Sequence, residues 1–99
     1  MEIIKRKSEK VLELLVRGRI DAALANQLEL ELLGAIRDGA ETIWVDLSEA
    51  QSLGSAGIRV LAQYYRQMKN NQKTLRIVRP SPQAESVLSL TGFQDLILR

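Results

Sequence analysis

The 99-residue chain contains no cysteine and no histidine. The lack of cysteine excludes disulfide bonds and thiol catalysis, and the lack of both residue types removes the ligands that most zinc sites use. Without histidine, a serine hydrolase has no imidazole base to activate its nucleophile. These absences leave carboxylates, hydroxyls and cations as the groups that can carry chemistry, and we expect no metal site and no cofactor.

Long apolar runs are also missing, because no hydrophobic stretch approaches twenty residues and the N-terminus does not resemble a signal peptide. Hydrophobic residues nevertheless make up 45% of the chain, which is ample for one small core. We therefore expect a single domain over residues 1–99, located in the cytoplasm and not inserted in a membrane.

The charge balance is mixed: 14 basic and 12 acidic residues give a net charge of +2. The densest basic patch comprises Lys5, Arg6, Lys7 and Lys10 and flanks the expected turn between the first two strands. It lacks the interleaved aromatic residues that single-stranded nucleic-acid sites use. We interpret it as a solvated turn and expect no direct nucleic-acid partner.

Strand patterns are found at residues 2–6, 10–17, 42–47 and 74–78, and residues 96–98 can form a last short edge strand. The second of these is almost continuously apolar, which is typical of a strand covered on both faces. Gly18 and Arg19 are expected to turn the chain after it. Trp44, inside the third pattern, is expected to be buried for its large area.

Helix patterns alternate with these strands. Asp21 can cap a helix that Gly39 ends, and Ser81 with Pro82 can begin a shorter helix that Gly92 closes. Between them, a helix that ends near residues 70–71 has the apolar stripe Ile58, Leu61, Ala62, Tyr65 and Met68. The alternation predicts an α/β fold with a mixed, mostly parallel sheet of four to five strands, an antiparallel pair at its N-terminal side, and three to four helices.

Residues 46–61 are the most informative stretch, because an apolar strand ends there and a loop of small residues leads into the central helix. Ser55 lies where that helix should begin, and spacing alone predicts a plain N-cap serine. The ends of parallel strands gather at one edge of a sheet, so we expect Asp21, Asp46 and Ser55 to lie near one another.

Five segments in order resemble the STAS domain family of anti-sigma factor antagonists. They are Gly-Arg-Ile-Asp at 18–21, Val-Asp-Leu-Ser-Glu-Ala at 45–50, Leu-Gly-Ser-Ala-Gly-Ile-Arg-Val-Leu at 53–61, Leu-Arg-Ile-Val-Arg-Pro-Ser-Pro at 75–82 and Leu-Ser-Leu-Thr-Gly-Phe at 88–93. The resemblance covers residues 18–97, about four-fifths of the chain.

The resemblance implies a STAS-like domain that acts as a non-catalytic regulator of transcription in bacterial signalling. Ser55 takes the place of the serine that a partner kinase phosphorylates. The implied partners are an anti-sigma factor that is also a serine-protein kinase, and a phosphatase. Phosphorylation of Ser55 would release the chain from the kinase. The chain itself is expected to be a monomer or a weak homodimer. The implied loop and partner-binding residues are Asp21, Asp46, Ser48, Gly54, Ala56, Gly57, Ile58 and Arg59.

One position departs from the family pattern, since Gly54 stands where the family commonly has aspartate before the serine. Loss of this carboxylate loosens the loop. It leaves open a constitutive subunit without a phosphorylation switch, for example beside the ATPase of a lipid transporter. An aspartyl phosphoacceptor at Asp46 is disfavoured, because the acidic pair and the lysine that would hold magnesium and phosphate are not suitably placed.

Overall fold

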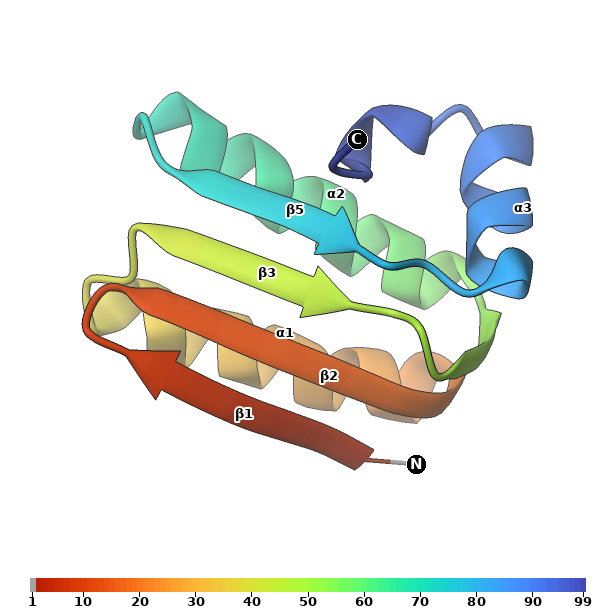
Figure 1. The fold of residues 1–99 in the computed structure, drawn as a ribbon, viewed down its shortest axis with the longest axis horizontal. Coiled ribbons are helices and arrows are strands. Elements are labelled where there is room, and N and C mark those ends of the chain that lie inside the picture. The colour runs from red at the N-terminus through yellow and green to blue at the C-terminus, as the bar shows by residue number, and fades with distance from the viewer. Residues whose placement is uncertain (1) are drawn as a thin grey trace.

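The computed structural model describes residues 2–99 and contains five β-strands, three α-helices and one 3₁₀-helix in those residues (Figure 1). In chain order the elements are β1 (Glu2–Ser8), β2 (Val11–Ile20), α1 (Ala22–Arg37), β3 (Thr42–Asp46), β4 (Ala50–Leu53), α2 (Ser55–Asn70), β5 (Thr74–Val78), α3 (Pro82–Leu90) and η1 (Gln94–Leu96).

The sheet has the strand order β1-β2-β3-β5, and the short β4 pairs with the carboxyl end of β2. β1 runs antiparallel to β2, whereas the pairs β2·β3, β3·β5 and β2·β4 are parallel. The prediction of an α/β fold with a mixed, mostly parallel sheet and an N-terminal antiparallel pair is therefore confirmed.

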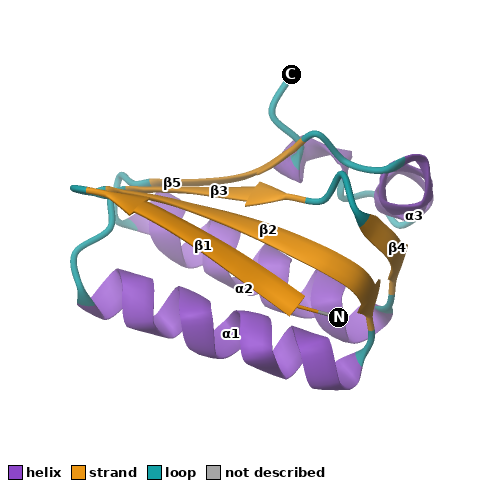
Figure 2. Ribbon diagram, turned by 60° about the horizontal axis from the view of Figure 1, so that its bottom comes forward, coloured by secondary structure: helices purple, strands orange, loops and turns teal. Residues whose placement is uncertain are grey.

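Both long helices, α1 and α2, lie against the same face of the sheet (Figure 2). The side chains that point toward them are buried, including Leu14, Val16, Val45 and Ile77, each fully inaccessible to solvent. In residues 2–99 no helix lies in front of the opposite face (Figure 1). The expectation that β2 is covered on both faces is wrong, because its alternate residues Glu13, Leu15 and Arg17 are only partly buried.

Trp44 lies on this open face, paired in register with Glu13 of β2 and Arg76 of β5. It is half-buried, so the expectation of a buried tryptophan is also wrong. A sequence run rich in apolar residues does not distinguish a two-sided strand from a one-sided strand whose outer positions carry occasional large apolar groups.

The region around Gly18 differs from the sequence interpretation. Instead of turning the chain, Gly18 adopts a positive φ of 108° within β2, and the pairing register to β4 shifts between Gly18 and Arg19. Such a bulge bends a strand without ending it. β2 consequently continues to Ile20 and offers an edge to the short β4, which the sequence did not predict.

The predicted ends of α1 and α3 are confirmed. The Asp21 carboxylate accepts a hydrogen bond from the Leu24 amide (3.0 Å), and the Ser81 hydroxyl accepts one from the Ala84 amide (3.1 Å). Gly39 and Gly92 follow α1 and α3 with φ values of 87° and 82°, which glycine adopts without a steric penalty. The C-terminal strand reduces to a single bridge between Ile77 and Ile97, which follows the 3₁₀ turn η1.

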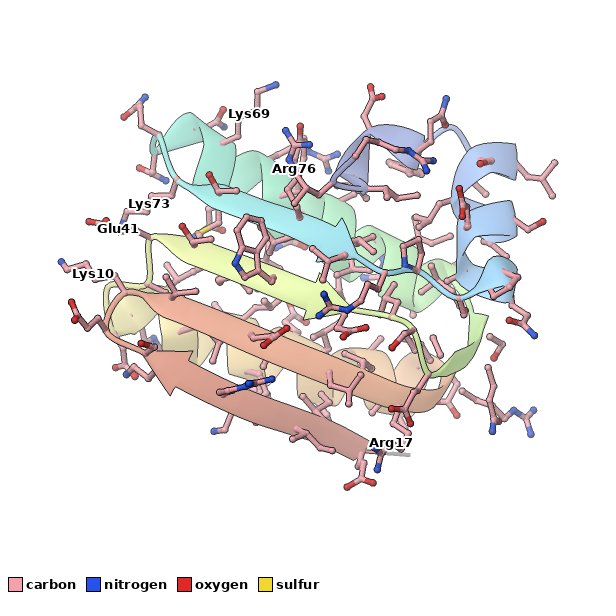
Figure 3. The ribbon with its side chains drawn as sticks, in the orientation of Figure 1. Lys10, Arg17, Glu41, Lys69, Lys73 and Arg76 are labelled. Atoms are coloured by element: carbon pink, nitrogen blue, oxygen red, sulfur yellow. The ribbon has the colours of Figure 1, made fainter. Side chains whose placement is uncertain are left out.

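Each cation of the N-terminal basic patch faces a carboxylate of its own fold. Lys10 and Glu41 meet beside the β1–β2 turn, at the left of Figure 3. Such exposed ion pairs contribute little stability, but they offset the positive charge of the patch locally. The complete set is Lys5–Glu31, Arg6–Glu13, Lys7–Asp38 and Lys10–Glu41.

A tyrosine links the two helices that lie under the sheet. The Tyr64 hydroxyl of α2 donates a hydrogen bond to the Glu29 carboxylate of α1 (2.8 Å), and Tyr64 is only 3% exposed. The sequence pattern included Tyr65, and not Tyr64, in the apolar stripe of α2. Tyr65 is instead half-buried, with Lys69 and Arg76 over its ring at 5.8 and 5.6 Å from the centroid.

We expect this contact to make the free energy of unfolding depend on alkaline pH. Burial, followed by the hydrogen bond and negative charge of Glu29, raises the pKa of Tyr64 from 10.0 to about 12. A raised pKa gives stability that is complete below the unfolded pKa and is lost as the pH rises from about 10 toward 12. We expect the free energy of unfolding to fall by about 1 kcal/mol between about pH 10 and about pH 11 through this group alone.

The measurement is urea unfolding of the native protein and of Tyr64→Phe across that pH range. The phenylalanine variant cannot titrate at this position, so its stability should fall less steeply. Parallel pH profiles for the two proteins would show that Tyr64 does not ionise in this range.

Candidate partner-binding site

The position of Ser55 is set by β4, which pairs with the last residues of β2. At the end of that pairing the Gly54 amide donates a hydrogen bond to the Ile20 carbonyl (3.0 Å). Gly54 has extended backbone angles and is the N-cap of α2, since the Ile58 amide donates a hydrogen bond to the Gly54 carbonyl (3.1 Å). Ser55 is therefore the first residue of α2, fixed at a rigid junction of strand and helix.

The predicted capping role of Ser55 is wrong. The helix has no side-chain cap, because its N-cap is Gly54, and the Ser55 hydroxyl makes no hydrogen bond within residues 2–99. The residue is exposed. Ser55 is therefore accessible to solvent at the start of α2, where the amides of the first turn have no partner within the helix.

Gly57, two residues after Ser55, is required by close packing. A Cβ atom at Gly57 would lie 2.7 Å from Ile20 Cγ2 and 2.9 Å from Leu53 Cδ1, both closer than carbon atoms can pack. A Cβ at Gly54 would lie 3.3 Å from the Ile20 carbonyl oxygen. The Gly54 contact is tight rather than forbidden, and its extended backbone (φ −85°, ψ 173°) is one that any residue adopts.

Of the two aspartates predicted near Ser55, Asp21 directly follows Ile20, whose carbonyl accepts the bond from Gly54. Asp21 is exposed and caps α1. Asp46 accepts hydrogen bonds from the Ser48 amide (2.9 Å) and from Arg79 (3.0 and 2.9 Å), and makes none to the Ser55 loop. Strand β4 lies between Asp46 and Ser55 in the sequence. The prediction that Asp21, Asp46 and Ser55 lie near one another is therefore kept only for Asp21 and Ser55.

The Asp46 carboxylate orders the end of β3. Burial alone would raise its pKa, but hydrogen bonds from Ser48 and Arg79 outweigh burial, so that the pKa lies below the ordinary value of 3.8. Arg79 also donates to Glu13 (2.8 Å) and adopts a positive φ of 47°. The pair ties the carboxyl ends of β3 and β5 together next to the segment that becomes β4.

We expect Asp46→Asn to lower the free energy of unfolding by about 1.5 kcal/mol at pH 7, the lower end for hydrogen bonds to a charged group because Arg79 is exposed. A depressed pKa gives stability that is present above the unfolded pKa and lost as the pH falls through the folded pKa. The deficit of the variant should therefore shrink below about pH 4. Urea unfolding at pH 7 and pH 3 tests this, and a deficit equal at both pH values would contradict it.

The other predicted loop residues occupy different environments. Ser48 is exposed after β3, Ala56 is half-buried, and Ile58 is 7% exposed. Arg59 is exposed, as are the polar positions opposite the apolar stripe of α2, which are Gln63, Arg66 and Gln67. α2 therefore presents an accessible polar face.

Sequence reasoning missed a groove beside Ser55. It has a volume of about 370 Å³ and lies between the outer side of α2 and the turn that follows α3, where Thr91 and Phe93 line it. It also missed that the buried Ser81 hydroxyl donates to the Ala50 carbonyl (2.7 Å), which fastens β4 to the start of α3. Neither feature has a local sequence signal, because both join segments about thirty residues apart.

Within residues 2–99 no group of three or more acidic side chains is arranged to hold a metal ion. In the same residues no helix is long and apolar enough to cross a membrane.

Comparison with known proteins places this geometry in a family. The chain is 28% identical over 96 residues to a putative anti-sigma factor antagonist, BtrV, of Bordetella bronchiseptica, covering 97% of this chain and 83% of that protein. The fold superimposes on the unphosphorylated form of the anti-sigma factor antagonist SpoIIAA with a TM-score of 0.86 at 17% identity, covering 98% of this chain and 86% of that chain. The phosphorylated form of the Bacillus cell fate determinant SpoIIAA gives a TM-score of 0.80, also at 17% identity, over 98% and 89%. The sequence profile of the STAS domain matches residues 2–99. The chain belongs to the STAS domain family.

Proposed function

We propose that the chain is an anti-sigma factor antagonist: a non-catalytic module that binds an anti-sigma factor with serine-kinase activity and is released when that kinase phosphorylates Ser55. The observation that carries the proposal is the Ser55 hydroxyl, exposed and without a hydrogen bond within residues 2–99, at the first position of α2 in a STAS domain. The relatives named as anti-sigma factor antagonists support it.

The physical chemistry of the site suits a switch that acts on the surface. A phosphate on Ser55 meets the free amides and the positive end of the α2 dipole, so the fold tolerates it. The modification adds close to two negative charges at the centre of the proposed contact surface. Burying that charge therefore weakens binding to the partner and does not destabilise the fold of this chain.

The test is direct binding, measured by calorimetry, between the purified chain and each serine-kinase anti-sigma factor encoded in the same genome. We expect one of them to bind the unmodified chain and, on addition of ATP, to transfer one phosphate to Ser55. Because sigma factors act on RNA polymerase, this function places the chain in the cytoplasm. Absence of binding to every such kinase would refute the proposal.

A second candidate is a constitutive STAS subunit of a larger complex, such as one with a transporter ATPase, in which Ser55 is never modified. The observation in its favour is Gly54, which stands where the family commonly has aspartate and leaves no carboxylate beside the Ser55 hydroxyl. A stable complex with an ATPase, unaffected by phosphatase treatment, would favour this candidate.

A further inference from the structure

The groove beside Ser55 combines an apolar floor with cations that have no acidic partner. Ile58 and Ala62 of α2 and Phe93 of the turn after α3 supply the apolar surface, and Arg59 and Arg66 border it. The two apolar α2 side chains are only 7% and 3% exposed, so the partly buried Phe93 offers more apolar surface to a partner than they do. Neither arginine belongs to an ion pair in residues 2–99, although seven other cations there do.

The chain segment that contains α2 carries charge of one sign, although the exposed Asp95 follows Phe93 by two residues. Between Glu49 and Glu85 the chain carries no acidic residue and six basic ones, namely Arg59, Arg66, Lys69, Lys73, Arg76 and Arg79. Of these, Arg79 is neutralised by Asp46 and Glu13. Figure 3 shows Lys69 and Lys73 near the C-terminal end of α2 and the start of β5, with Arg76 on β5, so these three cations lie outside the groove.

From this geometry we infer that the groove receives an acidic amphipathic segment of the partner protein, with its apolar side chains on Ile58, Ala62 and Phe93 and its carboxylates on Arg59 and Arg66. Charge complementarity selects this occupant, because a basic or neutral segment would leave both arginines unpaired at the interface. An amphipathic helix bound in a groove contacts it through apolar side chains about one helical turn apart. Ile58 and Ala62 are also spaced by about one turn on α2.

The inference rests on the proposed function for the identity of the partner, and it adds a mechanism of release. Ser55 lines the same groove, and Arg59 follows it by four residues, so both lie on one face of α2. Helical side chains lean toward the N-terminus, which brings Arg59 toward a phosphate on Ser55. The phosphate then pairs with Arg59, which the partner's carboxylate would otherwise contact. This competition for Arg59 displaces the partner.

The first experiment uses a defined probe that does not depend on the partner. The full chain, labelled with ¹⁵N, is titrated with a blocked peptide of about twelve residues of leucine and glutamate, in parallel with one that has lysine in place of glutamate. We expect shifts in residues 55–66 and 91–93 with the acidic peptide only. Arg59→Gln/Arg66→Gln should weaken its binding about fivefold to tenfold, whereas Arg37→Gln, an exposed cation at the far end of α1, should leave it unchanged.

Equal binding of the acidic and basic peptides, no binding of either, or shifts outside the groove would overturn the inference. The second experiment repeats the variants with the kinase. Binding by the kinase that Arg59→Gln/Arg66→Gln leaves unaffected would also overturn it. Peptide binding in the groove without any kinase binding would support the groove's preference for acidic segments and refute the proposed function, so the two failures are distinguishable.

Discussion

Ser55→Asp is expected to bind the partner kinase at least about thirty-fold more weakly than Ser55→Ala, because a charge buried without a partner at an interface costs about 2 kcal/mol or more. The alanine variant removes only a hydroxyl that makes no hydrogen bond in residues 2–99 and should bind as tightly as the native chain. Comparing the aspartate and alanine variants separates the effect of the added negative charge from the effect of losing the serine hydroxyl.

The control for this prediction is the stability of the fold. An aspartate in the first turn of a helix is favourable by up to about 1 kcal/mol, so Ser55→Asp should be as stable as the native protein or slightly more so. Equal kinase affinity of the aspartate and alanine variants, with both folded, would rule out an electrostatic switch at this position.

Gly57→Val is expected to lower the free energy of unfolding by about 3 kcal/mol, the largest effect on stability that we predict. Its Cβ alone would collide with Ile20 Cγ2 and Leu53 Cδ1, and Ile20 is fully buried, so it cannot yield without moving the end of β2. Gly57→Ala should lose about 2 kcal/mol, even though alanine favours a helix more than glycine does.

Gly34 in α1 provides the matched control. A Cβ there meets nothing within 4 Å, so Gly34→Ala should gain about 0.5 to 1 kcal/mol from helix propensity alone. Urea unfolding of the three variants measures these differences. If Gly57→Ala and Gly34→Ala had the same sign and size, the close approach of α2 to the ends of β2 and β4 would be in error.

Local signals in the sequence predicted the parts of the fold that local interactions determine. Asp21, Gly39, Ser81 and Gly92 mark helix ends because caps use backbone groups within a few residues. The parallel order followed from the alternation of strands and helices. These rules needed no knowledge of which face of the sheet the helices cover.

What the sequence did not predict depends on contacts distant along the chain. The strand β4 has no strand pattern of its own and forms because the bulge at Gly18 extends β2 to meet it. The cap of α2 moved from Ser55 to Gly54 for the same reason, since the Gly54 amide is held by Ile20. The buried Tyr64 was overlooked because its partner, Glu29, belongs to another helix.

The site was predicted in part. The resemblance directed attention to the strand-to-helix junction, where the structure places Ser55 on the surface. The groove was not foreseen, because Phe93 comes from a turn about thirty residues beyond α2. Arg79 was overlooked as the partner of Asp46 because the ends of β3 and β5 meet only in the folded sheet.

The central claim, that Ser55 is a phosphorylation switch, is tested most directly by intact-mass analysis of the protein from its native host under phosphatase inhibition, with fragmentation to locate any phosphate. We expect a fraction of the protein to carry one phosphate on Ser55 and to be absent from the complex with the kinase. Protein that is always unmodified and held in a stable complex would contradict it and favour the constitutive subunit.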